Sequence, residues 1–394
     1  MKNLVIMLKT KCKICGNGEV PIAIILEVCR DCIIRRWDKA KGFVDKAHRV
    51  SREEFDLPRK EDLSGADDSS QIVICHQCVN NCKIPEGKKG FCGIKKNRDG
   101  KFYQIAGTKK IGFVDYYYDP LPTNCVASWA CAEKDTGDYR KKRFALHSTS
   151  SRGNNLAVFY QTCTFDCLFC QNWHFRECLQ SPRKLSASEL ASAVDTRTRC
   201  VCYFGGDPAS QFTHSLATSL EIMKAANNKV RICWETNGSA NPRMMQKAAE
   251  ISLATGGTIK FDLKAFTPEI HYALTGCSNT QTLENFRLLS ERMRDKRDSS
   301  VPNCSESSLL CTATLLVPGY ITVDEVRKIA KFIAQCNPNI PYSLLAFYPH
   351  YLFPDLPTTS TEHAYKAEEI CKEEGLKNVH IGNIHLLSKN EYHY

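Results

Sequence analysis

Short apolar runs alternate with amphipathic stretches along the chain from residue 155 onward. Each run has the length of a β-strand buried on both faces, and the stretches between runs have the periodicity of helices with one apolar face. We expect strands at residues 156–161, 201–206, 230–235, 258–263, 311–317, 343–348 and 378–382. We expect helices that include residues 186–194, 214–226, 241–254 and 322–335. This alternation predicts a parallel sheet with helices packed on it.

Residues of unusual chemistry follow several successive predicted strands, which favours a barrel over an open doubly wound sheet. Barrel enzymes place their sites at the carboxyl ends of the strands. The predicted fold class is therefore α/β, a partial (β/α) barrel with a cysteine-rich N-terminal region and a small C-terminal extension. We expect N-terminal cysteine knuckles in 1–50, a polar linker in 51–71, a second cysteine loop with a tyrosine-rich segment in 72–150, the barrel in 151–335, and its C-terminal end in 336–394. Residues 294–308 are expected to form a surface loop.

The chain has 394 residues and a formal net charge of +10. Its basic residues concentrate at 88–101 and 138–143. Such runs are typical of solvated faces or of surfaces that dock an acidic partner. Apolar runs fall short of the ~20 residues that span a membrane, and the N-terminal one is too short for a signal peptide. We therefore expect a cytoplasmic protein with no membrane partner.

Structural disulfides are not expected among the 22 cysteines of the chain, because cytosolic thiols are kept reduced. Eleven of the cysteines fall into tight clusters, which are interpreted as metal-binding groups. The first group is a pair of CxxC knuckles, formed by Cys12, Cys15, Cys29 and Cys32. This spacing suits a tetrahedral site for zinc or mononuclear iron, and four protein ligands leave no position open for a substrate. We expect a structural metal there.

A second group follows on a glycine-rich loop and comprises Cys75, Cys78, Cys82 and Cys92. Four thiolates at this spacing predict another mononuclear zinc or iron site, again with a structural role. The cysteines that lie singly in apolar runs, such as Cys202, Cys233 and Cys311, are interpreted as small buried hydrophobes.

A third group, Cys163, Cys167 and Cys170, falls in the sequence CTFDCLFC directly after the first predicted barrel strand. Three thiolates that hold a cluster of four irons and four sulfides leave one iron open to a small-molecule ligand. The three cysteines therefore predict a reactive cluster at the mouth of the barrel.

This CxxxCxxC motif, with Phe169 before its last cysteine, resembles that of the radical S-adenosylmethionine (radical SAM) superfamily. The resemblance implies a [4Fe–4S] cluster whose open iron binds SAM, and a 5′-deoxyadenosyl radical formed from it. It also assigns SAM-binding roles to residues after four later strands: Gly205, Gly206 and Asp207 in a GGE-type motif, Glu235, Thr236 and Asn237 in WETNG, Asp262 and Lys264 in a DxK pair, and Val317, Pro318 and Gly319 beside the adenine. Asp207 stands where the family usually has Glu.

Three further stretches resemble the branch of activating enzymes and their relatives: QNWHFR after the cluster motif, the cysteine loop with GFCGIKKN, and HYALTGCSNTQTLENFR at 271–287. Together with the N-terminal knuckles and the tyrosines, they are most similar to the cobalamin-dependent arginine C-methyltransferases of methyl-coenzyme M reductase in methane-forming cells. That resemblance implies cobalamin and methylation of an arginine δ-carbon, which has no acidic proton for a base to remove. The chain has no Asp-x-His-x-x-Gly cobalamin signature, so cobalamin would have to bind without it. Its expected site is residues 345–360, with His350, Tyr348 and Tyr351 lining the pocket; the alternative is that this segment is a surface loop.

Tyr116, Tyr117 and Tyr118 give a separate hypothesis. One of them is expected to ligate the open iron as a phenolate when SAM is absent, which would protect the cluster from premature reduction. The alternative is that they are ordinary core or interface tyrosines.

Two other functions are compatible with the sequence. The chain is either an activating enzyme that makes a glycyl radical on a partner protein without methyl transfer, or a non-enzymatic electron carrier with several metal centres. In both enzymatic interpretations the substrate is a protein and a reduced electron donor is needed. The basic runs lack the interleaved aromatic residues that favour a nucleic-acid partner.

Overall fold

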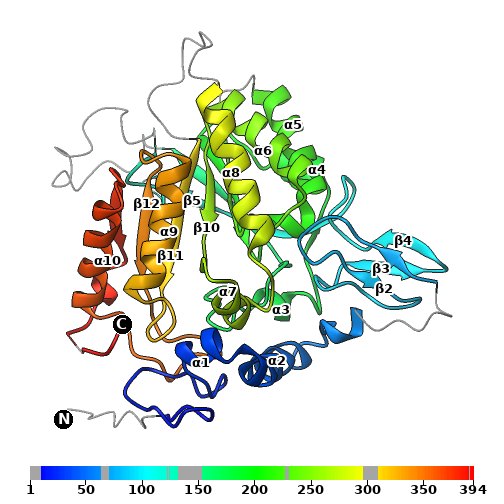
Figure 1. Ribbon diagram of the computed structural model, residues 1–394. Helices are drawn as coiled ribbons and strands as arrows, with labels where there is room; N and C mark the ends of the chain where they lie inside the picture. Colours follow the sequence, from blue (N-terminus) through cyan, green and yellow to red (C-terminus); the bar gives the residue numbers. More distant parts are fainter. Residues whose placement is uncertain are drawn as a thin grey trace, which may run out of the picture.

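The computed structural model describes residues 10–63, 71–121, 123, 125–131, 153–226, 230–295, 309–389 and 391–394. Its centre is a nine-stranded sheet with strand order β13-β12-β11-β10-β9-β8-β6-β5-β7 (Figure 1). The parallel strands are β6 (Asn154–Tyr160), β8 (Thr198–Gly205), β9 (Arg231–Thr236), β10 (Ile259–Asp262), β11 (Leu310–Leu316), β12 (Tyr342–Ala346) and β13 (Val379–Gly382). The seven expected strands are confirmed, as is the mixed α/β architecture.

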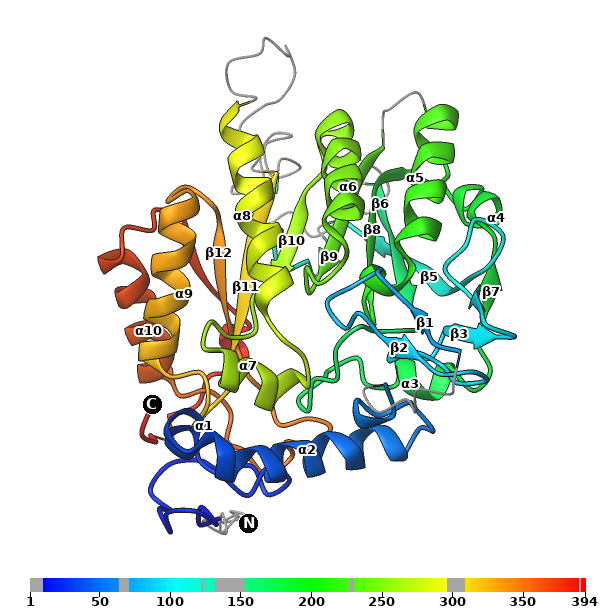
Figure 2. The same ribbon diagram turned by 45° about the vertical axis from the view of Figure 1, so that its right-hand side comes forward.

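Helices cover one face of this sheet, and Figure 2 shows them in a row along it. They are α4 (Ala187–Ala191), α5 (Phe212–Ala226), α6 (Pro242–Thr255), α8 (Thr280–Asp295), α9 (Val323–Cys336) and α10 (Thr361–Glu373). The four expected helices are among them. The short helices α3 (Phe175–Cys178) and α7 (Pro268–Thr275) lie at one end of the sheet (Figure 2), and 3-10 turns occupy Glu61–Leu63, Pro208–Gln211 and Ile384–Leu386.

The pleat of the strands separates a helix-covered face from an inner face. Tyr203 pairs with Trp234, and their side chains bond Ser219 and Ser215 of α5, so this set faces the helices. Because alternate residues point to opposite faces, the next positions along the strands face inward. Figures 1 and 2 show a curved sheet whose inner face is away from the helices.

The tyrosine-rich segment is part of this sheet and not of the cysteine-rich region. β5 (Gly112–Pro120) pairs antiparallel with β6 along its length, and β7 (Lys184–Leu185) pairs with the start of β5. The expected boundary at residue 151 is therefore wrong, because it would separate two hydrogen-bonded strands.

The N-terminal region forms helices α1 (Arg30–Arg35) and α2 (Trp37–Glu53), which cross one end of the sheet below α7 and α3 (Figures 1 and 2). The linker expected to begin at residue 51 does not begin there. Ser51 and Arg52 belong to α2 and are buried, since they contact the cysteine loop after β6. Residues 64–70 of that segment lie outside the described residues.

The second cysteine loop carries two small hairpins, β1 (Val73–Ile74) with β2 (Lys83–Ile84) and β3 (Lys95–Arg98) with β4 (Lys101–Gln104). The expectation that the basic run 88–101 is a solvated face fails at Lys95, which is buried and donates to Gln104 Oε1 at 2.8 Å. The basic run at 138–143, and residues 296–308 of the expected surface loop, lie outside the described residues. Within the described part of the chain, no helix is long and apolar enough to cross a membrane.

Candidate active site at the carboxyl ends of the strands

Cys163, Cys167 and Cys170 lie in the loop that follows β6, and this loop contacts helix α7. The amides of Asp166 and Leu168 donate to the carbonyls of Thr275 and Leu274 in α7, at 2.8 and 3.1 Å. Burial raises the pKa of the Cys163 thiol. Unlike the N-terminal knuckle cysteines, the three sulfurs do not form a group within 4.8 Å of one another, and their ligation of an iron–sulfur cluster remains a prediction.

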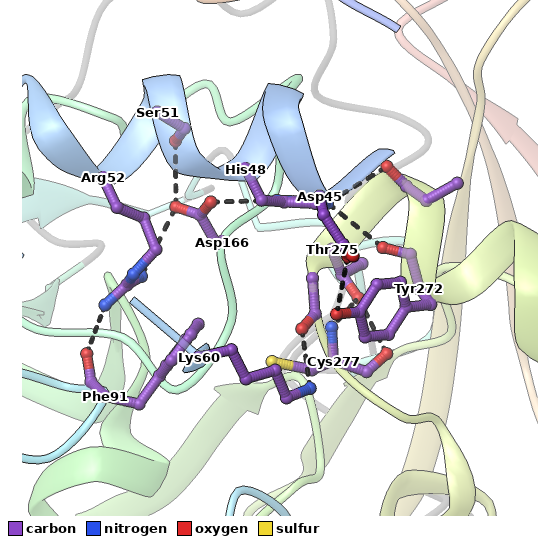
Figure 3. Close-up of polar contacts among 12 residues, drawn as sticks. Asp45, His48, Ser51, Arg52, Lys60, Phe91, Asp166, Tyr272, Thr275 and Cys277 are labelled. Carbon is purple, nitrogen blue, oxygen red and sulfur yellow. Dashed lines mark hydrogen bonds and ion pairs between the residues drawn. The ribbon is translucent and has the colours of Figure 1, made fainter. Parts of the chain in front are cut away.

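Asp166, in the middle of this loop, is the charged centre of a buried network that the sequence did not reveal (Figure 3). Its carboxylate accepts from Ser51 Oγ at 2.9 Å and from Arg176 Nη2 at 3.0 Å, and it lies 2.9 Å from His48 Nδ1. Burial alone raises the pKa of Asp166, but the His48 hydrogen bond and the charges of Arg52 and Arg176 overcome it and hold the pKa well below its usual range. The spacing of His48, Ser51 and Arg52 along α2 is the only signal that the sequence offered.

The same helix also reaches the second cysteine loop. The Arg52 guanidinium lies 3.6 Å from the centre of the Phe91 ring and donates to the Phe91 carbonyl. Gly276 lies under His48, where an added Cβ would approach within 3.0 Å of the imidazole. α2 therefore connects three loops at the carboxyl end of the sheet.

The turn after β8 contains Gly205, Gly206 and Asp207. A Cβ on Gly206 would lie 2.3 Å from the Thr162 carbonyl, so the close approach to the cysteine loop requires glycine. Burial raises the pKa of Asp207 to about 7. Its carboxylate accepts from the amides of Ala209 and Asn237, both at 2.6 Å, and from Thr236 Oγ1 at 3.0 Å.

Asp207 thus joins two strand ends, whereas the resemblance predicted that it would accept from the SAM amino group. Asn237 continues the connection, since its Nδ2 donates to Thr164 Oγ1 at 2.9 Å. Thr236 and Asn237 are buried beside the cysteine loop, as the predicted grouping requires. Their contact with SAM remains a prediction.

Asp262 and Lys264 form an ion pair at the end of β10. The Lys264 ammonium lies 5.3 Å from the centre of the Phe169 ring. Burial raises the pKa of Cys167, and the Lys264 charge opposes that shift. Lys264 therefore lies beside the cysteine loop, and the role of the DxK pair in binding SAM remains a prediction.

Glu235 lies on the inner face, where its carboxylate is 3.6 Å from Lys260 Nζ. The sequence did not single out Lys260. Its side chain is 4% exposed and that of Glu235 is 35% exposed.

The Gly319 turn packs against the N-terminal knuckles. Gly319 has φ of +79°, and a Cβ there would lie 2.1 Å from the Pro21 carbonyl. Tyr320 Oη accepts from the Ala23 amide at 3.0 Å. Val317 and Pro318 precede this turn, and their role beside adenine remains a prediction.

Of the three tyrosines, only Tyr117 shares the inner face. It lies opposite Ala157, beside the Phe204 ring at 6.2 Å, and is 53% exposed. Tyr118 donates to the Ala193 carbonyl, and the Tyr116 ring lies 4.9 Å from the Arg183 guanidinium. Tyr117 shares a row of the sheet with Ala157 and Cys202, below the loop that follows β6, and iron ligation by a tyrosine remains a prediction.

The segment at 345–360, expected to hold cobalamin, packs on the cysteine loop. The Leu352 amide donates to the Leu168 carbonyl at 3.0 Å. The Tyr351 ring stacks on Trp173 with centroids 5.5 Å apart, and its hydroxyl is 3.0 Å from Ser51 Oγ. His350 begins the turn that the Phe353 amide closes on the His350 carbonyl.

The first cysteine group forms a compact site in which the sulfurs of Cys12, Cys15, Cys29 and Cys32 all lie within 4.8 Å of one another. Cys15 Sγ and Cys29 Sγ are 3.7 Å apart. A tetrahedron with metal–sulfur bonds of ~2.3 Å has edges of about 3.8 Å, so these residues fit one zinc or iron ion.

In the part of the chain that the structure describes, the second group does not form such a site. Cys75 donates its amide to the Cys82 carbonyl across the β1–β2 hairpin, and the Phe91 amide points at Cys82 Sγ at 3.3 Å. Burial raises the pKa of Cys82 to about 12. The sulfurs of Cys75, Cys78, Cys82 and Cys92 do not form the predicted compact geometry of a mononuclear site, and a metal there remains a prediction.

Comparison with known proteins agrees with this site. Residues 157–333 match the family model of the radical SAM superfamily. An uncharacterized protein of Methanocaldococcus jannaschii is 23% identical over 321 residues, which cover 79% of this chain and 81% of that protein. A pyruvate formate-lyase-activating enzyme of Staphylococcus aureus is 25% identical over 221 residues, which cover 52% of this chain and 80% of that enzyme.

Among solved structures, a domain of a pyruvate-formate lyase-activating enzyme from Bacteroides vulgatus aligns with 46% of this chain and 98% of its own length, at 18% identity and a TM-score of 0.35. That score is too low to carry an argument. The family match contains β8 to β11 and the cysteine loop. Residues 157–333 are therefore a radical SAM domain, which implies a [4Fe–4S] cluster and SAM.

Proposed function

We propose that this chain is a radical SAM enzyme that abstracts a hydrogen atom from a polypeptide substrate. One observation carries the proposal: the cysteine loop, the Asp262–Lys264 pair and the Asp207–Thr236–Asn237 group meet at one edge of the sheet. When bound, the cluster and SAM supply the 5′-deoxyadenosyl radical, which can attack a carbon that no side-chain base deprotonates.

The residues of this chain hold and orient the reactants. Cys163, Cys167 and Cys170 would ligate the cluster. The Lys264 ammonium supplies a positive charge for the carboxylate of SAM. The ion pair with Asp262 holds this ammonium in place. The Asp207 carboxylate keeps the ends of β8 and β9 together, so that Asn237 stays against the cysteine loop.

A protein substrate is supported by the named relatives, which include activating enzymes of pyruvate formate-lyase. An activating enzyme produces a glycyl radical on its partner, and this is the first candidate reaction. The exposed residues Lys88, Lys89, Arg98 and Lys101 form a basic surface for an acidic partner or a reduced electron donor.

Cobalamin-dependent methylation of an arginine δ-carbon in methyl-coenzyme M reductase is the second candidate. The tyrosine-rich segment is part of that resemblance, and its residue Tyr117 is exposed on the inner face of the sheet. The packing of Tyr351 on Trp173 and Ser51 weakens this candidate, since part of the segment expected to bind cobalamin is engaged with the protein itself.

The decisive experiment measures the products of SAM under anaerobic reduction, with reconstituted protein, cobalamin and an arginine-containing peptide from methyl-coenzyme M reductase. 5′-Deoxyadenosine alone, with an unmodified peptide, supports radical formation and the first candidate, which a glycyl-radical partner would then test. S-adenosylhomocysteine and 5′-deoxyadenosine in comparable amounts, together with a peptide heavier by one methylene, support the second candidate. The variant Cys163→Ala/Cys167→Ala/Cys170→Ala is the control, and equal 5′-deoxyadenosine from it would refute both.

A further inference from the structure

Lys260 is a buried cation on the inner face of the barrel, and it contacts two sulfurs. Its Nζ lies 2.9 Å from Cys125 Sγ and 3.0 Å from Cys202 Sγ. The Glu235 carboxylate is farther away, at 3.6 Å, and is partly exposed. A buried charge is costly unless it is paired, and the Glu235 carboxylate and the two sulfurs are the partners of Lys260.

The strand register brings more cysteines to the same face. Cys202 lies opposite Cys233, and Lys260 lies between Glu235 on β9 and Cys311 on β11. The outward positions on the same strands carry Val201, Tyr203, Ile232 and Trp234, all fully buried. Cys202, Cys233 and Cys311 are buried, as the sequence predicted. They differ from the outward residues because they share their face of the sheet with a lysine and a glutamate.

Residues 125–131, which follow β5 in the sequence, contact this inner face of the sheet. Trp129 Nε1 donates to Ser343 Oγ at 2.9 Å, and its ring stacks on His380 with centroids 5.0 Å apart. Ser343 Oγ donates to the Val126 carbonyl at 3.1 Å. These contacts hold Cys125 on Lys260, and Cys131 ends the same short segment.

We propose that Cys125, Cys131, Cys202 and Cys233 bind a second iron–sulfur cluster inside the barrel, with Lys260 as its counter-ion. The four thiolates come from β8, β9 and the 125–131 segment, which fixes their directions before any metal arrives. A cluster ligated by four thiolates carries net negative charge, and the Lys260 ammonium offsets it where water is scarce.

The spacing favours a cluster over a single ion. The knuckle cysteines lie within 4.8 Å of one another, as one tetrahedral ion requires, but among the described residues the inner cysteines do not form such a group. Cys202 precedes Gly205 by three residues, a distance of ~10 Å along an extended strand. The second cluster would therefore lie deeper in the barrel than the site of the first.

The test begins from Cys163→Ala/Cys167→Ala/Cys170→Ala, so that the radical SAM cluster contributes no iron and no SAM chemistry is needed. This parent is reconstituted anaerobically with iron and sulfide, and its iron, acid-labile sulfide, zinc and reduced-state electron paramagnetic resonance are measured. Adding Cys202→Ser and Cys233→Ser is expected to remove iron and sulfide together with a resonance signal. Adding Cys371→Ser, a buried cysteine on α10, should change none of them.

Unchanged iron and sulfide in the Cys202→Ser/Cys233→Ser variant would overturn the proposal, as would loss of zinc in place of iron. A measurement on the parent guards against misfolding of that variant: mass spectrometry should show Cys125 and Cys131 protected from alkylation after reconstitution and labelled after chelation. Equal labelling in both states also refutes the cluster. Lys260→Met should shift the resonance or the reduction potential, with Lys260→Arg closer to the parent.

Discussion

His48 on α2 and Asp166 in the cysteine loop meet with Nδ1 and Oδ2 2.9 Å apart, although 118 residues separate them along the chain. The other ring nitrogen of His48 faces the carbonyls of Tyr272 and Ala273 at 3.1 and 3.2 Å. A helix of the N-terminal region therefore holds the loop whose cysteines would carry the radical SAM cluster. This contact makes the cysteine-rich region a part of the site and not an appendage to it.

Replacing Asp166 by Asn is expected to lower the free energy of unfolding by about 3–5 kcal/mol, because the buried Arg52 and Arg176 lose their shared counter-charge. Urea unfolding of the metal-free protein, followed by circular dichroism, measures the change. Glu369→Gln is the control, since its ion pair with Lys366 is on the surface and should contribute nothing measurable. An unfolding midpoint for Asp166→Asn equal to that of the wild type would contradict the network.

Replacing Cys32 by Ser is expected to release the metal of the N-terminal knuckles and to loosen the cysteine loop, since α1 and α2 follow directly from the ligands. Metal analysis and amide hydrogen exchange measure the two effects. Faster exchange is expected in α2 and at the Asp166 amide. Exchange unchanged at Asp166 despite loss of the metal would show that the two sites are independent.

Lys264→Met is expected to weaken SAM binding by about tenfold or more, because a charged hydrogen bond contributes roughly 1.5–3 kcal/mol. Anaerobic equilibrium dialysis of the reconstituted protein measures the affinity. Lys366→Met, on the exposed face of α10, is the matched control. The same affinity in Lys264→Met and in the control would remove Lys264 from the SAM site.

Two buried histidines each contribute a loss of stability in mild acid, and the raised pKa of Asp207 contributes in the opposite direction. Burial lowers the pKa of both His271 and His363 to about 4, from the model-compound value of 6.5. Between these values the unfolded chain binds more protons, so the free energy of unfolding rises with pH, by up to ~1.4 kcal/mol per pH unit for each histidine. The contribution is present above pH 6.5 and is lost as the pH falls toward 4.

Urea unfolding between pH 7.5 and 5 measures this slope. His363→Gln is expected to reduce it, whereas His385→Gln, at an exposed position, should leave it unchanged. A slope that is the same in His363→Gln and in the wild type would show that His363 is not buried as a neutral group.

The amino-acid sequence by itself determined the features that depend on neighbouring residues. Apolar runs predicted β6 and the strands from β8 to β13, and amphipathic periods predicted α4, α5, α6 and α9, because pleat and helical pitch act over a few residues. The spacing of Cys12, Cys15, Cys29 and Cys32 likewise predicted a compact metal site, since two CxxC turns hold their sulfurs locally.

Only the tertiary structure decided which residues of distant segments form ion pairs, hydrogen bonds and packing contacts with one another. The Asp166 network, the role of Asp207 between two strands, and the contacts of Lys260 with Cys125 and Cys202 join residues far apart in the sequence. The sequence did not predict β5, because its tyrosines belong to a strand only through the hydrogen bonds that β5 forms with β6. The side of the sheet that a cysteine faces depends on strand register and on what packs against it, and the residues around that cysteine in the sequence do not contain this information.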